Sequence, residues 1–227
     1  MAGSEGGEGF AQPFTGNGEA DDGSLTYKDE NGRKLATSGN HIFTTTNGEG
    51  LYRRLKTKDR PAGMLDAHGK FGAGNSHVYV AFLVSLETGS VNSFGDYGGL
   101  SLFNSRSEEL FIGDPGFDGS NTFWGIDPHE GPEKVQSSGI AVDSTVRLLV
   151  TRIDFAAAGA TVRLYIDPDL SAEPQKATVG PIDMHSFRFD RIRIQGGGNG
   201  SYSFDELALG TEYKDVVKIA KPKLVQR

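Results

Sequence analysis

The segment Val78-Tyr-Val-Ala-Phe-Leu-Val-Ser85 indicates the fold class more clearly than any other stretch of the chain. Its apolar run is short for a helix, and most of its side chains are β-branched or aromatic, which favours an extended strand. We therefore predict a strand at this segment.

Segments of the same kind recur along the chain, separated by glycine-rich or polar turns. Asn31-Gly32 tolerates positive φ at both turn positions and predicts a hairpin over 25–37. Apolar residues change face near Asp190 in the run 187–194, so a bulge or a strand start is expected there. Short helical turns are expected around 211–217. The remaining predicted strands are 10–14, 99–103, 109–113, 123–126, 134–137, 146–154, 161–166 and 202–209.

The density of turns also points to an all-β fold. Glycine supplies 32 of the 227 residues, about twice its usual share, and the glycines fall between apolar runs as turn residues do. A parallel sheet would need long helical crossovers, and no segment shows a convincing helical stripe. We predict one domain, a two-sheet antiparallel β-sandwich or jelly roll.

Composition narrows the classes of partner. The formal net charge is −7, and basic residues are scattered apart from 53–58 and 214–227. Nucleic acid is not expected, because binding a duplex needs clustered Lys and Arg. The absence of cysteine excludes disulfides and thiolate metal sites. No apolar run is long enough to span a membrane, and the first residues lack the pattern of a signal peptide.

Several motifs resemble a known family. They are Gly-Leu-Ser-Leu-Phe (99–103), Glu-Glu-Leu-Phe-Ile-Gly-Asp (108–114), Arg-Ile-Asp-Phe (152–155), Leu-Tyr-Ile-Asp-Pro-Asp-Leu (164–170) and Phe-Asp-Glu-Leu-Ala-Leu-Gly (204–210). The chain resembles laminin-G-like domains of exported planctomycete- and verrucomicrobial-type bacterial proteins. The resemblance implies a concanavalin A-like fold over 10–217, after a flexible segment 1–9 and before a tail 218–227. It also implies a secreted or cell-surface location, and it implies no activity.

The resemblance further implies a structural calcium site. Domains of this kind often hold Ca²⁺ where the first and last strands meet, and Asp205 occupies the matching position. Backbone carbonyls near Gln12 and Gly39-Asn40 are the expected partners, since Ca²⁺ takes six to eight oxygen ligands. The alternative is that Asp205 only accepts hydrogen bonds from loop N–H groups.

Catalytic motifs are weak. The E-x-D-x-x-E pattern of related sandwich hydrolases is absent, and Glu109 and Asp114 fall on opposite faces of a regular strand. A lyase would use Tyr or His as a base, with Arg or Gln neutralising a uronate. The five histidines are candidates for that base. Arginines that could line one face and suit an acidic polysaccharide are Arg152, Arg163, Arg191 and Arg193.

The loop-rich region 114–129 is the best candidate for sugar binding, because aromatic rings can stack on pyranose rings while short polar groups fix the hydroxyls. The expected ligand-binding residues are Trp124, Phe117, Asp118, Asn121, Asp127 and Tyr97. Trp124 could instead fill the core. We predict a non-catalytic module that binds a polysaccharide or a cell-surface glycan. The alternatives are a polysaccharide hydrolase or lyase, and a protein that self-assembles through its sheet edges.

Overall fold

The computed structural model describes residues 9–44, 49–58, 63–88, 96–116, 123–129 and 134–221. Within these ranges nearly all regular structure is strand. The elements are β1 (Thr15–Gly16), β2 (Glu19–Asp21), β3 (His41–Thr44), β4 (Glu49–Arg54), β5 (His77–Thr88), β6 (Tyr97–Asn104), β7 (Ser107–Asp114), β8 (Phe123–Asp127), β9 (Gln136–Ala141), β10 (Arg147–Phe155), β11 (Ala160–Ile166), β12 (Val179–Met184), β13 (Arg191–Gly197), β14 (Ser201–Gly210) and α1 (Tyr213–Val216).

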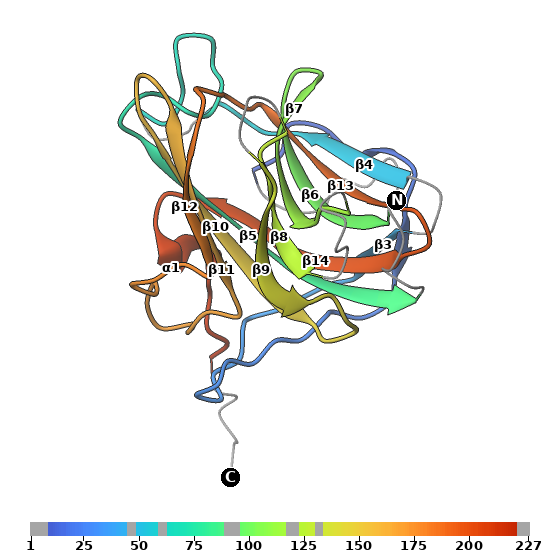
Figure 1. The fold of residues 1–227 in the computed structure, drawn as a ribbon. Helices are drawn as coiled ribbons and strands as arrows, with labels where there is room; N and C mark the ends of the chain where they lie inside the picture. The colour runs from blue at the N-terminus through green and yellow to red at the C-terminus, as the bar shows by residue number, and fades with distance from the viewer. Residues whose placement is uncertain are drawn as a thin grey trace.

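The strands form two seven-stranded sheets (Figure 1). Sheet I has the order β1-β4-β13-β6-β7-β8-β9, and sheet II has the order β12-β11-β10-β5-β14-β3-β2. Every pair of neighbouring strands is antiparallel. The predicted two-sheet antiparallel sandwich is confirmed.

Strand β5 occupies the middle of sheet II, between β10 and β14. Val78, Val80 and Phe82 point into the main core between the sheets. Tyr79 and Leu83 point the other way, into a second apolar cluster on the outer side of sheet II. Both faces of β5 are therefore buried, which explains why its sequence is apolar almost throughout.

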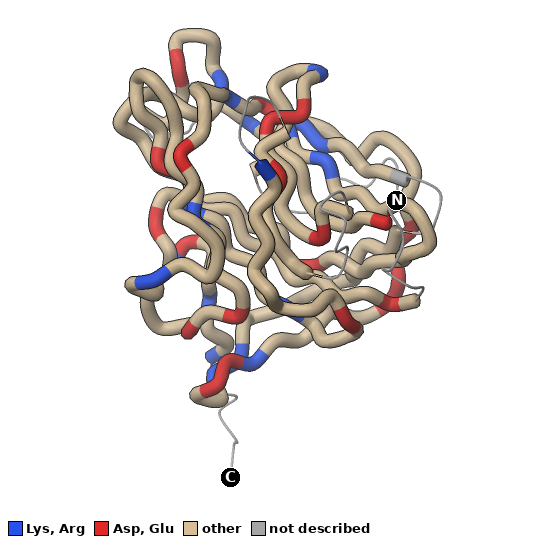
Figure 2. Tube along the Cα trace, in the orientation of Figure 1, with Lys and Arg blue, Asp and Glu red and all other residues tan. Residues whose placement is uncertain are grey.

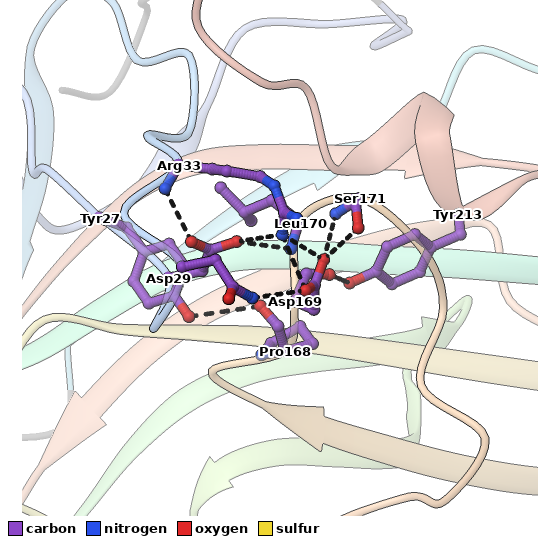
Figure 3. A network of polar contacts seen from close by, with 9 residues as sticks. Tyr27, Asp29, Arg33, Pro168, Asp169, Leu170, Ser171 and Tyr213 are labelled. Carbon is purple, nitrogen blue, oxygen red and sulfur yellow. Dashed lines mark hydrogen bonds and ion pairs between the residues drawn. The ribbon is translucent and has the colours of Figure 1, made fainter.

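A clasp of polar contacts closes the second cluster (Figure 3). Asp29 accepts hydrogen bonds from the backbone N–H groups of Arg33 and Leu170, at 2.7 and 3.1 Å. The guanidinium of Arg33 bridges Asp29 and Asp169. The Tyr213 hydroxyl donates to the carbonyl of Asp169 at 2.7 Å. These bonds hold the predicted Asn31-Gly32 hairpin and α1 against the turn at 168–171.

Several boundaries follow the sequence patterns. Gly32 has φ of 80°, as predicted, but Asn31 does not have positive φ, because the turn is closed by the bond from Gly32 N–H to the Asp29 carbonyl and so has Glu30 and Asn31 at its centre. β13 begins at Arg191, so the change of face near Asp190 marks a strand start. The helical turn predicted within 211–217 is α1, and no helix among the described residues is long and apolar enough to cross a membrane.

Strands β1, β2, β3, β4 and β12 were not predicted, and the predicted strand 10–14 contributes only an isolated bridge from Phe10 to Leu55. β12 contains Gly180 and Pro181 and lies at the edge of sheet II, where a missing N–H is tolerated. β4 contains Arg53 and Arg54, and its alternation is hard to see because Arg53 points inward. The Arg53 guanidinium is buried against the rings of Phe10 and Phe14, at 4.2 and 4.7 Å from their centroids.

Candidate functional site

The outer face of sheet I collects polar side chains from four neighbouring strands. In β6 and β13 the residues Leu100, Leu102, Ile192 and Ile194 face the core, so the residues between them face outward. Trp124 and Ile126 fix the direction of β8 in the same way. The outward residues that we group as the sheet I face are Tyr52, Tyr97, Ser101, Glu108, Phe111, Asp127, Arg193 and Gln195, with His129 just after β8.

Ser101, Glu108 and Gln195 form the hydrogen-bonded centre of this face. The Gln195 amide donates to the Ser101 hydroxyl at 2.6 Å and to Glu108 Oε1 at 2.9 Å. Ser101 in turn donates to the same carboxylate oxygen. Glu108 reaches Ser101 because a register shift in the β6–β7 ladder places it opposite Phe103. Three polar groups from three strands are therefore fixed in one arrangement.

His129 connects Glu108 to a second carboxylate, Asp127. Its Nε2 atom lies 3.8 Å from Glu108 Oε2, and its Nδ1 atom lies 3.5 Å from Asp127 Oδ2. The side chain of His129 is 42% exposed, whereas those of Glu108 and Asp127 are each 15% exposed. Burial raises the pKa of Asp127, His129 opposes that rise, and Glu108 adds to it. The histidine is the accessible member of a partly buried acid–histidine–acid group.

Aromatic side chains flank this polar centre. The Tyr52 ring contacts Phe103 edge-on at 5.6 Å, and the Arg193 guanidinium lies 4.9 Å from the Tyr52 ring centroid. Arg193 can reach Tyr52 because its guanidinium crosses over Gly50, where a Cβ atom would lie 2.3 Å from Arg193 Nε. On the other side, the Tyr97 and Phe111 rings meet edge-on at 6.4 Å.

Trp124 does not belong to this face. It is 0% exposed, points into the main core and contacts the Tyr202 ring at 6.5 Å. A fully covered indole has no surface on which a sugar ring could stack, so the structure agrees with the alternative that Trp124 fills the core.

The other predicted sugar-binding residues divide into two groups. Asp127 and Tyr97 both lie on the sheet I face, on β8 and β6. They are brought near each other by Phe111, which pairs with Asp127 across the β7–β8 ladder and contacts the Tyr97 ring. Phe117, Asp118 and Asn121 lie outside the described residues.

The four arginines that were expected to line one face lie on two. Arg191 and Arg193 belong to the outer face of sheet I, whereas Arg152 and Arg163 face outward from sheet II. The expectation is wrong because the four residues come from β10, β11 and β13, and β13 belongs to the opposite sheet. Lys and Arg are accordingly spread over the fold (Figure 2).

Of the residues predicted to bind calcium, Asp205, Gly39 and Asn40 line one pocket, whereas Gln12 does not. Asp205 lines a pocket together with Gly39 and Asn40, as expected. Its two oxygens accept hydrogen bonds from the backbone N–H groups of Leu25 and Glu206, both at 2.8 Å. Burial raises the pKa of Asp205, and these two bonds oppose that rise.

Gln12 fits a cation poorly. Its carbonyl accepts a 2.8 Å hydrogen bond from the Arg53 guanidinium, which places a positive charge beside it. The described residues contain no group of three or more His, Asp and Glu side chains that could hold a metal ion. Any calcium at Asp205 would therefore depend largely on backbone oxygens.

Sequence reasoning missed Ser101, Gln195 and Tyr52 as site residues. The available signal was alternation: Ser101 is polar between Leu100 and Leu102, and Gln195 continues the outward series of Arg191 and Arg193. What the sequence does not contain is the strand order. β13, β6 and β7 are neighbours in sheet I although β13 lies far from the other two along the chain.

The sequence matches no protein-family model and no curated protein sequence. Among solved structures, the chain is similar to the receptor-binding domain of botulinum neurotoxin D, with 11% identity and a TM-score of 0.45 over 86% of this chain and 45% of that one. The serotype D ligand-binding domain in complex with N-acetylneuraminic acid gives 11% identity and a TM-score of 0.46, over 88% and 45%.

A carbohydrate esterase of the Shiga toxin-encoding bacteriophage phi24B gives 12% identity and a TM-score of 0.44 over 88% of this chain and 91% of that one. This chain therefore spans slightly less than half the length of the toxin domains. Such identities and TM-scores are too low for a ligand or an activity to be transferred to it.

Proposed function

We propose that the chain is a non-catalytic carbohydrate-binding module whose binding surface is the sheet I face. The observation that carries the proposal is the exposed His129 between the partly exposed carboxylates of Glu108 and Asp127. The buried Ser101 and Gln195 fix Glu108 in place through hydrogen bonds to its Oε1 atom. In an exported protein, such a module would attach its carrier to a glycan-bearing surface.

The chemistry of the face suits sugar hydroxyls. A hydroxyl both donates and accepts, so it binds best where carboxylate and amide groups are already oriented by other bonds. His129 is the accessible partner, and Asp127 is partly exposed beside it. The partly exposed Tyr97 and Tyr52 provide aromatic surface on the same face. Pre-ordered side chains also lower the entropic cost of binding.

The test is a glycan array followed by titration of the best neutral hit. Wild type is expected to bind, and Asp127→Asn and His129→Ala are expected to weaken binding at least tenfold. Asp183→Asn is the matched control, because Asp183 is a carboxylate on β12 of the opposite sheet. An array without hits, or equal binding by Asp127→Asn and Asp183→Asn, would contradict the proposal.

A polysaccharide-cleaving enzyme is the second candidate, and His129 is the observation that favours it. A partly exposed histidine between two carboxylates can take up or release a proton at a bound sugar. Assays of reducing ends and unsaturated uronates on a panel of polysaccharides test this. Product that is formed by wild type and lost in His129→Ala would establish an enzyme and contradict a purely binding role.

We also propose a structural Ca²⁺ ion at Asp205. Support comes from the carboxylate itself, which is partly buried, has a raised pKa, and shares its pocket with Gly39 and Asn40. A bound cation would offset the cost of keeping that carboxylate charged away from water. Glu206 lines the same pocket, and burial raises its pKa as well.

A further inference from the structure

A second groove lies on the outer face of sheet II, remote in the fold from the sheet I face. Its floor is formed by β10 and β11, and one wall is the segment 173–177 that precedes β12. The groove has a volume of about 780 Å³, and all of its lining residues are described. A space of this size is within the range of small-molecule sites.

The charge of the groove differs from that of the chain. Its lining includes three cations, Arg152, Arg163 and Lys176, and two anions, Asp154 and Glu173, which leaves one excess positive charge. The chain as a whole carries −7. Asp183, at the edge of the groove beside Thr161, offsets that excess, so an anion would be attracted by the individual cations rather than by the net charge.

Arg152 is already neutralised by its neighbours. It donates to Asp154 at 2.9 Å and to Glu173 at 3.1 Å. Glu173 is further held by the hydroxyls of Tyr79 and Tyr165, at 2.6 and 2.7 Å. These groups form a rigid floor rather than a set of free donors.

Arg163 is the donor that the floor leaves available. It lies directly opposite Arg152 across the β10–β11 ladder, an arrangement of like charges that destabilises a sheet. Its one hydrogen-bond partner among the described residues is Asp154 Oδ2, at 2.5 Å, and Arg152 shares that carboxylate. Most of the five N–H donors of Arg163 thus remain unused, and its side chain is 33% exposed.

Lys176 and polar groups complete the set. Lys176 and Gln175 are exposed on the wall of the groove. Thr161 lies beside Arg163 on the floor, and because its hydroxyl donates to Asp183 at 2.9 Å, it can offer a ligand only an acceptor. Arginine recognises planar or tetrahedral oxyanions through paired N–H donors, and lysine adds a mobile positive charge.

We propose that this groove binds an anionic saccharide, whose carboxylate or sulfate group contacts Arg163 and Lys176 while its hydroxyls contact Gln175 and Thr161. The site is separate from the sheet I face and does not depend on that face binding sugar.

The test uses two matched pairs of probes in calorimetric titrations: trigalacturonate with its methyl ester, and glucose 6-sulfate with glucose. The charged member of at least one pair is expected to bind wild type, and the pair that responds identifies the anion. Binding should weaken as salt is raised, because the ion pairs are partly exposed. Arg163→Gln and Lys176→Glu should each weaken it at least tenfold.

Two controls separate this site from others. Arg54→Gln with Lys34→Gln removes two exposed positive charges outside the groove and should leave the affinity unchanged. Asp127→Asn should also leave it unchanged, so a failure of the sheet I proposal would not be mistaken for a failure here. Lys176→Glu touches none of the floor bonds, so its urea unfolding curve should match that of wild type, which separates loss of binding from misfolding. Binding of neither charged probe, or equal binding by Lys176→Glu, would overturn the inference.

Discussion

His129 Nδ1 lies 3.5 Å from Asp127 Oδ2 on the outer face of sheet I, in a pair whose histidine is exposed and whose carboxylate is largely covered. The covering costs more for a charged carboxylate than for a neutral one, which is why burial raises the pKa of Asp127 above its ordinary 3.8. The pair therefore links the acid–base behaviour of the proposed binding surface to the stability of the fold.

The raised pKa of Asp127 predicts that the free energy of unfolding depends on pH in a way that the Asp127→Asn variant lacks. The folded chain holds the Asp127 proton more tightly than the unfolded chain, so this residue adds stability as the pH falls through its raised pKa, and the gain is complete below 3.8. Urea unfolding at a series of pH values should show wild type gaining on Asp127→Asn towards acid. A difference that does not vary with pH would contradict the raised pKa.

Trp124 gives a prediction about the core. Trp124→Ala should destabilise the protein by about 3–5 kcal/mol, the usual cost of removing a large buried aromatic side chain. Trp124 is the sole tryptophan, so its fluorescence reports on this site alone. Emission should be blue-shifted and resistant to iodide, and saturating sugar should leave it nearly unchanged. Strong quenching by iodide in the folded protein would place the indole at the surface instead.

The central strands of sheet II could be predicted because a strand buried on both faces is apolar almost throughout its short length. Val78–Ser85 is apolar on both faces and became the middle of sheet II, and 146–154 became β10 beside it. Edge strands were harder to predict. β12 contains Pro181 and lies at an edge, where most of its side chains are exposed, so it lacks the run of apolar residues on which the prediction depends.

The candidate site could be predicted only in fragments. Asp127 and Tyr97 were predicted because polar and aromatic residues near a loop suggest a binding role, and the structure places both on the sheet I face. Ser101 and Gln195 were not predicted, because their proximity follows from β13 pairing with β6. That pairing depends on packing among all the strands, which no local pattern records. Strand order also explains why the four predicted arginines lie on two faces: β13 belongs to sheet I, whereas β10 and β11 belong to sheet II.

Glu173 should be a strong contributor to stability through the floor of the sheet II groove. Burial raises its pKa, but bonds from Tyr79, Tyr165 and Arg152 outweigh that effect, so the pKa lies below its ordinary 4.5. Glu173→Gln should cost about 1.5–3 kcal/mol at neutral pH, the range for bonds to a charged group. The stability that Glu173 supplies is present above pH 4.5 and is lost as the pH falls through the lowered pKa.

Chemical unfolding of wild type and Glu173→Gln should therefore converge in acid. Asp183→Asn is the control, because Asp183 accepts a bond from the exposed Thr161 hydroxyl and should change stability by no more than about 0.5 kcal/mol. Equal losses in the two variants would show that the Glu173 bonds contribute nothing beyond a surface contact.

The last prediction concerns the proposed calcium ion at Asp205. A metal that binds the folded chain alone stabilises it by mass action, by about 2.7 kcal/mol at a concentration one hundred times the Kd. Calcium should therefore raise the melting temperature of wild type, and a chelator should reverse the rise. Asp205→Asn should abolish the response, because the amide loses the charge that attracts the ion. Asp21→Asn, at an exposed carboxylate on β2, should keep it.

Magnesium should have a smaller effect, since it requires a tighter octahedral site than one carboxylate and backbone carbonyls provide. If calcium leaves the wild-type melting curve unchanged, Asp205 serves only to accept the N–H groups of Leu25 and Glu206.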